Sequence, residues 1–173
     1  MLRLMLFRHA HADRPTGVAD HDRPLSEKGH EQARLMGRYI RAQGLEPSIF
    51  VVSTAKRTQE TWAQACASGE LAAAKVNEPR IYESSAGSLL EVVREQDASH
   101  ASVMLVGHNP GLERLAAWLV GSADSAAAAR LQREFAVGGL AVIDFPAASW
   151  AEIDAQGGHL ERFETPESVG QSR

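Results

Sequence analysis

The sequence predicts an α/β protein in which strands and helices alternate along the chain. Three short apolar runs, 2–7, 49–52 and 102–106, have the length and composition of buried strands. Each run stops at polar residues, and a segment with the apolar spacing of an amphipathic helix follows it. This order is that of βαβ units, which build a sheet covered by helices.

Length and composition are those of a single globular domain. The chain has 173 residues, enough to bury a core, with 44% hydrophobic and 23% charged residues. We expect one domain over residues 1–164 and a polar tail over 165–173.

Charge and cysteine content exclude several classes of protein. The net charge of −4 argues against a general nucleic-acid-binding surface, and no apolar run is long enough to cross a membrane. Cys66 is the only cysteine, which excludes an internal disulfide and a thiolate zinc cluster. Residues 1–7 are too short for a signal peptide, so we expect a cytoplasmic enzyme or binding domain. The sequence does not indicate an oligomeric state.

The opening strand delivers Arg8 and His9 to its carboxyl end, where open α/β sheets bind their ligands. The pair points to an anionic ligand and a nitrogen nucleophile or base, although it also suits the surface end of an edge strand. A polar loop over 13–24 is placed to close over a ligand. The helix that follows begins after the N-cap Ser26 and ends at about Ala42.

The second strand, 49–52, leads into a helix with Arg57 in its first turn. Free backbone N–H groups at a helix start attract anions, so this arginine suits an anion site, with a solvent-exposed helix arginine as the alternative. Residues 70–75 carry no structural signal, 80–82 are expected to form a short extended piece, and a helix is expected around 88–95.

The rest of the chain continues the alternation and ends in a tail, from Thr165, that should be frayed. The expected segments are a strand over 102–106, a loop or weak helix over 122–129, a strand over 140–145 and a terminal hairpin over 150–153 and 159–163.

The three strand ends place two arginines and two histidines at one edge of the predicted sheet: Arg8, His9, Arg57 and His108. An arginine fork matches phosphate oxygens in a bidentate manner, so two arginines suit one phosphoryl group. A histidine can attack phosphorus in line and become a phosphohistidine intermediate. No carboxylate cluster of the kind that binds metals lies at these strand ends.

Four short segments resemble the motifs of one family. Segment 8–10, Arg-His-Ala, is similar to the Arg-His-Gly signature of the histidine phosphatase (phosphoglycerate mutase-like) superfamily. Segment 23–29, Arg-Pro-Leu-Ser-Glu-Lys-Gly, resembles an element of its SixA-type phosphohistidine phosphatase branch. Segments 53–61 and 106–110 match those that carry the second arginine and the second histidine. The likeness keeps the same order over residues 1 to 120.

The resemblance implies a three-layer α/β/α sandwich around a mainly parallel sheet, and a phosphatase that needs neither a metal nor another cofactor. His9 would be the transiently phosphorylated nucleophile, while Arg8, Arg57 and His108 would hold the phosphoryl oxygens. The further residues that would bind the substrate are Arg23 and Asn109.

Nearby cations should keep His9 reactive. A histidine attacks only through an unprotonated nitrogen, and Arg8 and Arg57 disfavour the imidazolium form. The same cations would stabilise the charged intermediate. We expect His108, in contrast, to be protonated once the anion is bound and to donate a hydrogen bond to a phosphoryl oxygen.

Two departures from the family pattern bear on geometry and substrate. Ala10 stands where the family has glycine, and alanine would be strained if the position required a positive φ. Ester-cleaving members use a carboxylic acid to protonate the leaving alkoxide. Here Glu83 is the best-placed candidate, with a solvent-exposed surface role as its alternative, and Asp13 and Asp20 are weaker candidates.

The expected substrate is phosphohistidine in a protein, because imidazole leaves more readily than an alkoxide and needs less proton assistance. A small phosphate ester or nucleotide is the nearest alternative, and a non-catalytic phosphate-binding module is another; a mutase is least favoured. A metal pair at His9 and His11 is disfavoured, since no carboxylate or cysteine partner is evident. Neither nucleic acid nor membrane is expected as a partner.

Overall fold

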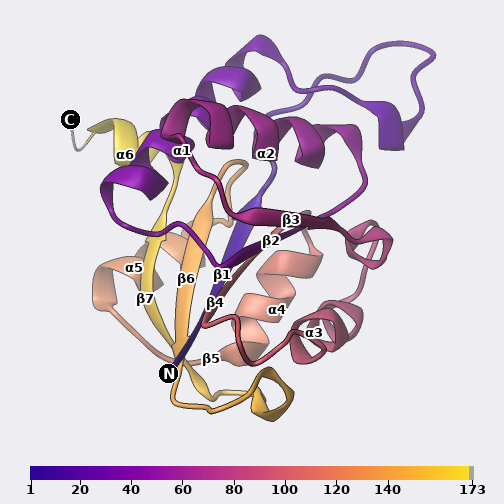
Figure 1. Ribbon diagram of the computed structural model, residues 1–173. Helices are drawn as coiled ribbons and strands as arrows, with labels where there is room; N and C mark the ends of the chain where they lie inside the picture. The colour runs from indigo at the N-terminus through magenta and orange to yellow at the C-terminus, as the bar shows by residue number, and fades with distance from the viewer. Residues whose placement is uncertain (172–173) are drawn as a thin grey trace.

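The computed structural model describes residues 1–171 and forms a seven-stranded sheet with helices on both faces (Figure 1). The strands are β1 (Leu2–Arg8), β2 (Ile49–Val52), β3 (Ala74–Asn77), β4 (Ser102–Gly107), β5 (Val120–Ala123), β6 (Leu140–Phe145) and β7 (Gly158–Glu164). Their order in the sheet is β3-β2-β4-β1-β6-β7-β5. Only β6 runs antiparallel to its neighbours, which confirms a mainly parallel sheet within the described residues.

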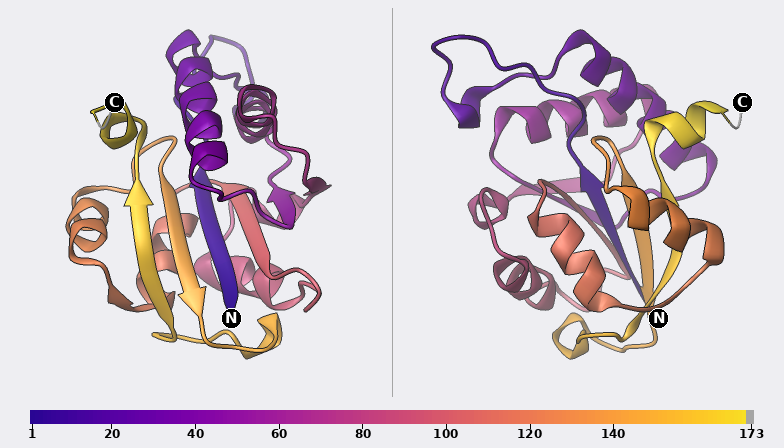
Figure 2. Two further views of the ribbon diagram at one scale, coloured as in Figure 1. Left: turned by 60° about the vertical axis from the view of Figure 1, so that its left-hand side comes forward. Right: turned by 180° about the vertical axis from the view of Figure 1, so that it is seen from behind.

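Helices cover the sheet as two outer layers, and the predicted α/β/α sandwich is confirmed (Figure 2). The helices are α1 (Glu27–Ala42), α2 (Lys56–Gly69), α3 (Ala86–Arg94), α4 (Gly111–Leu119), α5 (Ser125–Arg133) and α6 (Pro166–Gln171). Short 3₁₀ turns are η1 (Asp20–Asp22), η2 (Pro79–Ile81) and η3 (Trp150–Glu152). Helices α1, α2 and α6 pack on one face, and α3, α4 and α5 pack on the other.

Strand β1 is apolar almost throughout because both of its faces are buried. Leu2, Leu4 and Leu6 point into the core under α3 and α4, whereas Met5 and Phe7 point into the core under α1 and α2. The strand therefore lies at the centre of the fold, and its carboxyl end has little freedom to move.

Parallel pairing brings the carboxyl ends of β2, β4 and β1 to one edge of the sheet. Val52 of β2 pairs with Val106 of β4, and Gly107 of β4 pairs with Arg8 of β1. The residues that follow these three strands are consequently neighbours, as the sequence predicted. No helix within residues 1–171 combines the length and the apolarity needed to cross a bilayer.

In the middle of the chain, one strand had no signal in the sequence and one expected segment was wrong. Residues 74–77, which overlap the stretch 70–75 that carried no structural signal, form the edge strand β3. This strand is polar and largely exposed, so it shows no apolar pattern. The expected extended piece at 80–82 overlaps η2 instead. Pro79 starts this 3₁₀ turn, and Glu78 caps it by accepting a hydrogen bond from the N–H of Arg80.

The expectations for residues 120–164 also need correction. Residues 122–123 of the loop or weak helix expected over 122–129 belong to strand β5, and α5 follows it behind the N-cap Asp124. The predicted terminal hairpin is wrong, because Trp150 belongs to the 3₁₀ turn η3 and β7 pairs with β6 and β5. Trp150 is fully buried, which explains why this turn resembled a strand in sequence.

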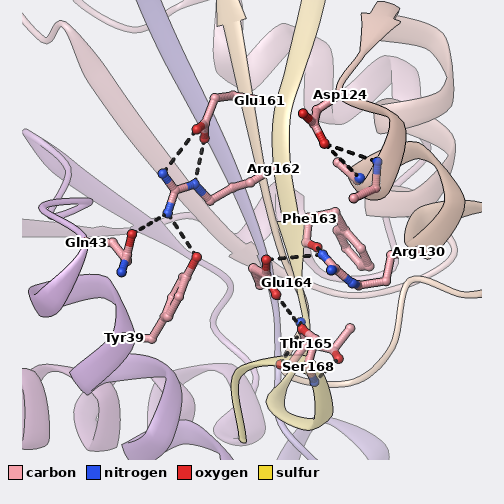
Figure 3. A network of polar contacts seen from close by, with 12 residues as sticks. Tyr39, Gln43, Asp124, Arg130, Glu161, Arg162, Phe163, Glu164, Thr165 and Ser168 are labelled. Atoms are coloured by element: carbon pink, nitrogen blue, oxygen red, sulfur yellow. Dashed lines mark hydrogen bonds and ion pairs between the residues drawn. The ribbon is translucent and has the colours of Figure 1, made fainter. Parts of the chain in front are cut away.

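The tail expected to fray from Thr165 is instead helical over 166–171, while 172–173 lie outside the described residues. Polar contacts secure the start of α6 (Figure 3): the N–H of Thr165 donates to Ser168 Oγ at 2.8 Å, and Ser168 N–H donates to Thr165 Oγ1 at 3.1 Å. Val169 is buried against α1. On β7, the strand that precedes α6, Arg162 donates to Tyr39 Oη of α1 at 2.9 Å.

Helices α1 and α2 pack so closely that their contact requires glycine. A Cβ atom on Gly37 would lie 2.1 Å from the carbonyl oxygen of Ala65, and one on Gly69 would lie 2.3 Å from the carbonyl oxygen of Gly37. Both obstacles are backbone atoms, which cannot turn aside as a side chain can. The two helices would have to separate to admit a methyl group.

We therefore expect Gly37→Ala to lower the free energy of unfolding by about 2–3 kcal/mol, despite the better helix propensity of alanine. Gly87→Ala is the matched control, because the nearest atom to a Cβ at this helical position is 3.8 Å away. Urea denaturation of both variants measures the difference. Equal stability of the two would contradict the proposed close contact.

Candidate active site at the carboxyl edge of the sheet

His9 directly follows β1 and is buried, with 8% of its surface exposed. Its Nδ1 lies 2.7 Å from the carbonyl oxygen of Ala10. A carbonyl oxygen only accepts hydrogen bonds, so Nδ1 carries the ring proton and Nε2 keeps its lone pair. The N–H of Gly138 donates to the carbonyl oxygens of Arg8 at 3.1 Å and His9 at 2.9 Å, which fixes the chain at this turn.

His108 directly follows β4, and its ring centroid lies 5.3 Å from that of His9. Its Nε2 lies 2.8 Å from the Oγ of Ser53, the residue after β2. Ser53 is fully buried, and within residues 1–171 Nε2 of His108 is the acceptor within reach of its hydroxyl, so the hydroxyl proton is directed at Nε2. The ring proton of His108 then sits on Nδ1, a buried atom without a hydrogen-bond partner among residues 1–171.

Arg8 and Arg57 bring two guanidinium groups to the same edge. Arg8, the last residue of β1, donates from Nη1 to the carbonyl oxygen of Phe135 at 2.8 Å. Arg57, in the first turn of α2, donates from Nη1 to the carbonyl oxygen of Asp20 at 2.7 Å and from Nη2 to its carboxylate at 3.2 Å. The Nε–H groups of both arginines are buried and have no partner in the described part of the chain. Each arginine thus keeps one N–H group without a hydrogen-bond partner in residues 1–171.

Asp20 joins the site as a carboxylate and not as a proton donor. It accepts from Tyr82 Oη at 2.5 Å and from Arg23 Nη1 at 3.1 Å, in addition to Arg57. These donors hold the pKa of Asp20 well below its usual range, and the same hydrogen bond raises the pKa of Tyr82 to about 12. Asp20 was a weaker candidate for the general acid, and this alternative is wrong because the group holds no proton to donate. Tyr82 was not predicted as a site residue, because nothing local in the sequence signals a partner 62 positions away.

Burial, more than the arginines, keeps both histidines neutral. Burial lowers the pKa of His9 to about 4; the hydrogen bond to Ala10 opposes this shift, and Arg57 and Arg8 add to it. Burial also lowers the pKa of His108 to about 3, with His9 and Arg57 contributing. The expectation that His108 is protonated refers to the state with a bound phosphoryl group and stays a prediction; the pKa of about 3 describes the ring without one. Its neutral ring still presents a donor, the Nδ1–H.

A cavity of about 400 Å³ opens beside His108 and is lined in part by Tyr82, Glu83 and Asn109. Glu83 is exposed, and its φ of 52° lies in the left-handed region. Asn109 donates from Nδ2 to the carbonyl oxygen of Phe135 at 2.9 Å, which leaves its buried Oδ1 as an acceptor without a partner in residues 1–171. The structure thus places both predicted residues, Glu83 and Asn109, at the site.

The remaining sequence-based candidates lie at its margin. Arg23 donates from Nε to the carbonyl oxygen of Asp13 at 3.0 Å and reaches the site through Asp20. Asp13 does not line the cavity, which His108 and Arg57 line and which His9, Arg8 and Arg23 do not. His11 Nδ1 is 2.7 Å from Ser26 Oγ, the predicted helix cap. Within the described residues, no three His, Cys, Asp or Glu side chains are arranged to hold a metal ion.

The alanine in the first motif introduces no backbone strain. Among residues 1–171, the non-glycine positions with positive φ are Glu70, Glu83 and Gln156, so Ala10 is not one of them. Ala10 is instead fully buried against Leu25 and Ala33. A small residue is what this position requires.

Comparisons with known proteins place this geometry in a family. The family model for the histidine phosphatase superfamily (branch 1) matches residues 4–102 of the sequence. This span contains His9 and Arg57 and ends before His108. An uncharacterised protein from Mycobacterium tuberculosis (strain H37Rv) is 33% identical over 161 residues, which cover 92% of this chain and 99% of that protein.

Two solved structures share the fold and more than a quarter of the sequence. A candidate SixA phosphohistidine phosphatase from Nakamurella multipartitia superimposes with a TM-score of 0.83 at 30% identity, covering 95% of this chain and 96% of that one. Its counterpart from Agrobacterium tumefaciens gives a TM-score of 0.79 at 29% identity, covering 95% and 98%. These similarities support a phosphatase. Since the family model spans more than half of its residues, the chain belongs to the histidine phosphatase superfamily, branch 1.

Proposed function

We propose that this protein is a metal-independent phosphatase that acts through a phosphohistidine intermediate on His9. The observation that carries the proposal is the unprotonated Nε2 of a buried, neutral His9 beside two arginines with unpaired donors. An anion site alone does not need such a lone pair, which an electrophilic phosphorus atom does. We further propose that the protein acts in the cytoplasm.

The reaction consists of two displacements at phosphorus. Nε2 of His9 forms a bond to phosphorus while the bond to the leaving group breaks. The ring keeps its proton on Nδ1, so the phosphorylated ring is an imidazolium. A water oxygen then attacks phosphorus, the phosphorus–nitrogen bond breaks, and its electron pair returns to Nε2. Orthophosphate takes both hydrogens of the water, and His9 is neutral again.

The surrounding donors match the charge that develops during these steps. Arg8 and Arg57 offer their Nε–H groups and His108 its Nδ1–H, all buried without partners among the described residues. Donors that are already oriented stabilise the transferring phosphoryl oxygens without reorganisation, and one such donor is worth about 3 kcal/mol in the transition state. Arg23 contributes positive charge from behind Asp20.

Protein phosphohistidine is the substrate that we propose, and the cavity beside His108 is where its imidazole would lie. The ring of Tyr82 provides an aromatic wall of this cavity, and the His21 ring packs against it with the two centroids 4.8 Å apart. Asn109 Oδ1 is an unpaired acceptor, which suits the N–H of a leaving imidazole better than an alkoxide. The similarity to candidate SixA phosphohistidine phosphatases supports the same substrate.

A phosphatase of small phosphate esters is the alternative, and the position of Glu83 favours it. This carboxyl group lines the cavity next to His108, where it would be able to protonate a leaving alkoxide. The two substrate classes therefore differ in their need for Glu83.

A rapid-quench experiment with a protein carrying ³²P-phosphohistidine tests the proposed intermediate. We expect base-stable, acid-labile label on His9 within one turnover, and His9→Ala should lose the label and at least about 10³-fold in kcat. His30→Ala, a substitution on α1 outside the site, is the control and should label normally. Turnover without label, or labelling of His9→Ala, would contradict the mechanism; phosphate binding without turnover would indicate the non-catalytic module.

Glu83→Gln separates the two substrate classes. We expect kcat for phosphohistidine to change by no more than about threefold, because a protonated imidazole leaves without an acid from the protein. If alkyl esters are the true substrates, kcat for them should be the higher of the two in the native protein and should fall at least about 10²-fold in the variant. Glu91→Gln, an exposed position on α3, is the charge-matched control.

The protonation state of His9 is open to direct measurement by ¹H–¹⁵N NMR of the imidazole nitrogens. At pH 5.5 we expect a neutral ring with the proton on Nδ1, because the pKa is lowered to about 4. A histidine with an ordinary pKa of about 6.5 would be about 90% protonated at that pH. Loss of the His9 signals in His9→Gln assigns them, and an imidazolium spectrum at pH 5.5 would refute the neutral nucleophile.

A further inference from the structure

The carboxylate of Asp20 occupies the arginines of the site in the way that a bound anion would. One of its oxygens accepts from Arg23 Nη1 at 3.1 Å, and the other accepts from Arg57 Nη2 at 3.2 Å and from Tyr82 Oη at 2.5 Å. Asp20, Arg57 and Tyr82 all line the cavity beside His108, so the negative charge stands at the wall of the cavity proposed for the leaving group and contacts Arg57 of the proposed phosphoryl site.

The position of Arg57 does not depend on this carboxylate alone. Arg57 Nη1 donates to the backbone carbonyl oxygen of Asp20 at 2.7 Å, a contact that any residue at position 20 would keep. The guanidinium also lies over the ring of Tyr82, 5.9 Å from its centroid. Removal of the carboxylate would thus take a negative charge from the site while leaving the arginine held.

We propose that Asp20 is a resident anion that weakens the binding of free orthophosphate and thereby limits inhibition by product. Its carboxylate competes with phosphate oxygens for the Nη2 donor of Arg57 and repels the phosphate charge. The penalty is the same for the phosphoryl group of substrate and product, but a substrate offsets it with contacts of its leaving group in the cavity, whereas orthophosphate has no such contacts. The kinetic part of this inference rests on the proposed phosphatase function, and the binding part does not.

Isothermal titration of the full-length protein with inorganic phosphate at pH 7.5 tests the binding part without turnover. We expect Asp20→Asn to bind phosphate about tenfold more tightly than the native protein, because a like charge a few ångströms away is removed. Asp20→Ala is a second variant with the same expectation. Asp22→Asn is the matched control: its carboxylate is on the same 3₁₀ turn, is 73% exposed, and has His21 as its ion-pair neighbour.

The control should bind phosphate within about twofold of the native affinity, since an exposed charge outside the site is screened by solvent and salt. Unchanged or weaker binding by Asp20→Asn would overturn the proposal and identify Asp20 as a residue that only positions Arg57. An equal gain in Asp22→Asn would also overturn it, because the effect would then be one of net charge. Failure of His9 to become labelled refutes the phosphatase proposal separately and leaves these phosphate affinities interpretable.

Discussion

The rest of the site depends on one constraint: the imidazole rings of His9 and His108 are buried at the ends of two paired strands. The pairing of β1 with β4 in register at Arg8 and Gly107 places His9 and His108 side by side. A shift of one residue along either strand would turn one ring to the opposite face of the sheet. Burial then makes both rings neutral, so the positive charge of the site comes from arginines, which remain protonated in any environment.

Unpaired polar atoms mark this edge as a place for a ligand. Within residues 1–171, five buried side-chain atoms lack a hydrogen-bond partner, and four of them belong to the site: Arg8 Nε, Arg57 Nε, His108 Nδ1 and Asn109 Oδ1. Each such atom costs about 1–3 kcal/mol. A closely packed fold tolerates four such unpaired atoms at one place when a ligand supplies the missing hydrogen-bond partners. Three of the four are donors, which points to an anion.

The strands and the strand-end residues were predictable because their signals are local. Apolar runs identified β1, β2, β4 and β6, and the carboxyl ends of the first three led to Arg8 with His9, to Arg57 in the first turn of α2, and to His108. Asp20 and Tyr82 were missed as partners because their contact depends on how two distant loops meet. The same reason explains the error at β7, whose pairing with β6 and β5 depends on packing of the whole sheet. The effect of burial on His108 was also beyond reach, since no motif reveals how deeply a ring is buried.

Charge balance explains how a site with three arginines can stay selective. Arg8, Arg57 and Arg23 without a counter-ion would hold any small anion, and a product phosphate would leave slowly. Asp20 neutralises part of that charge at the wall of the cavity, while the unpaired Nε–H donors of Arg8 and Arg57 remain available. Ground-state affinity is thereby reduced without removing donors that act in the transition state. Because the penalty is common to substrate and product, the selectivity comes from the leaving-group contacts that only a substrate makes in the cavity.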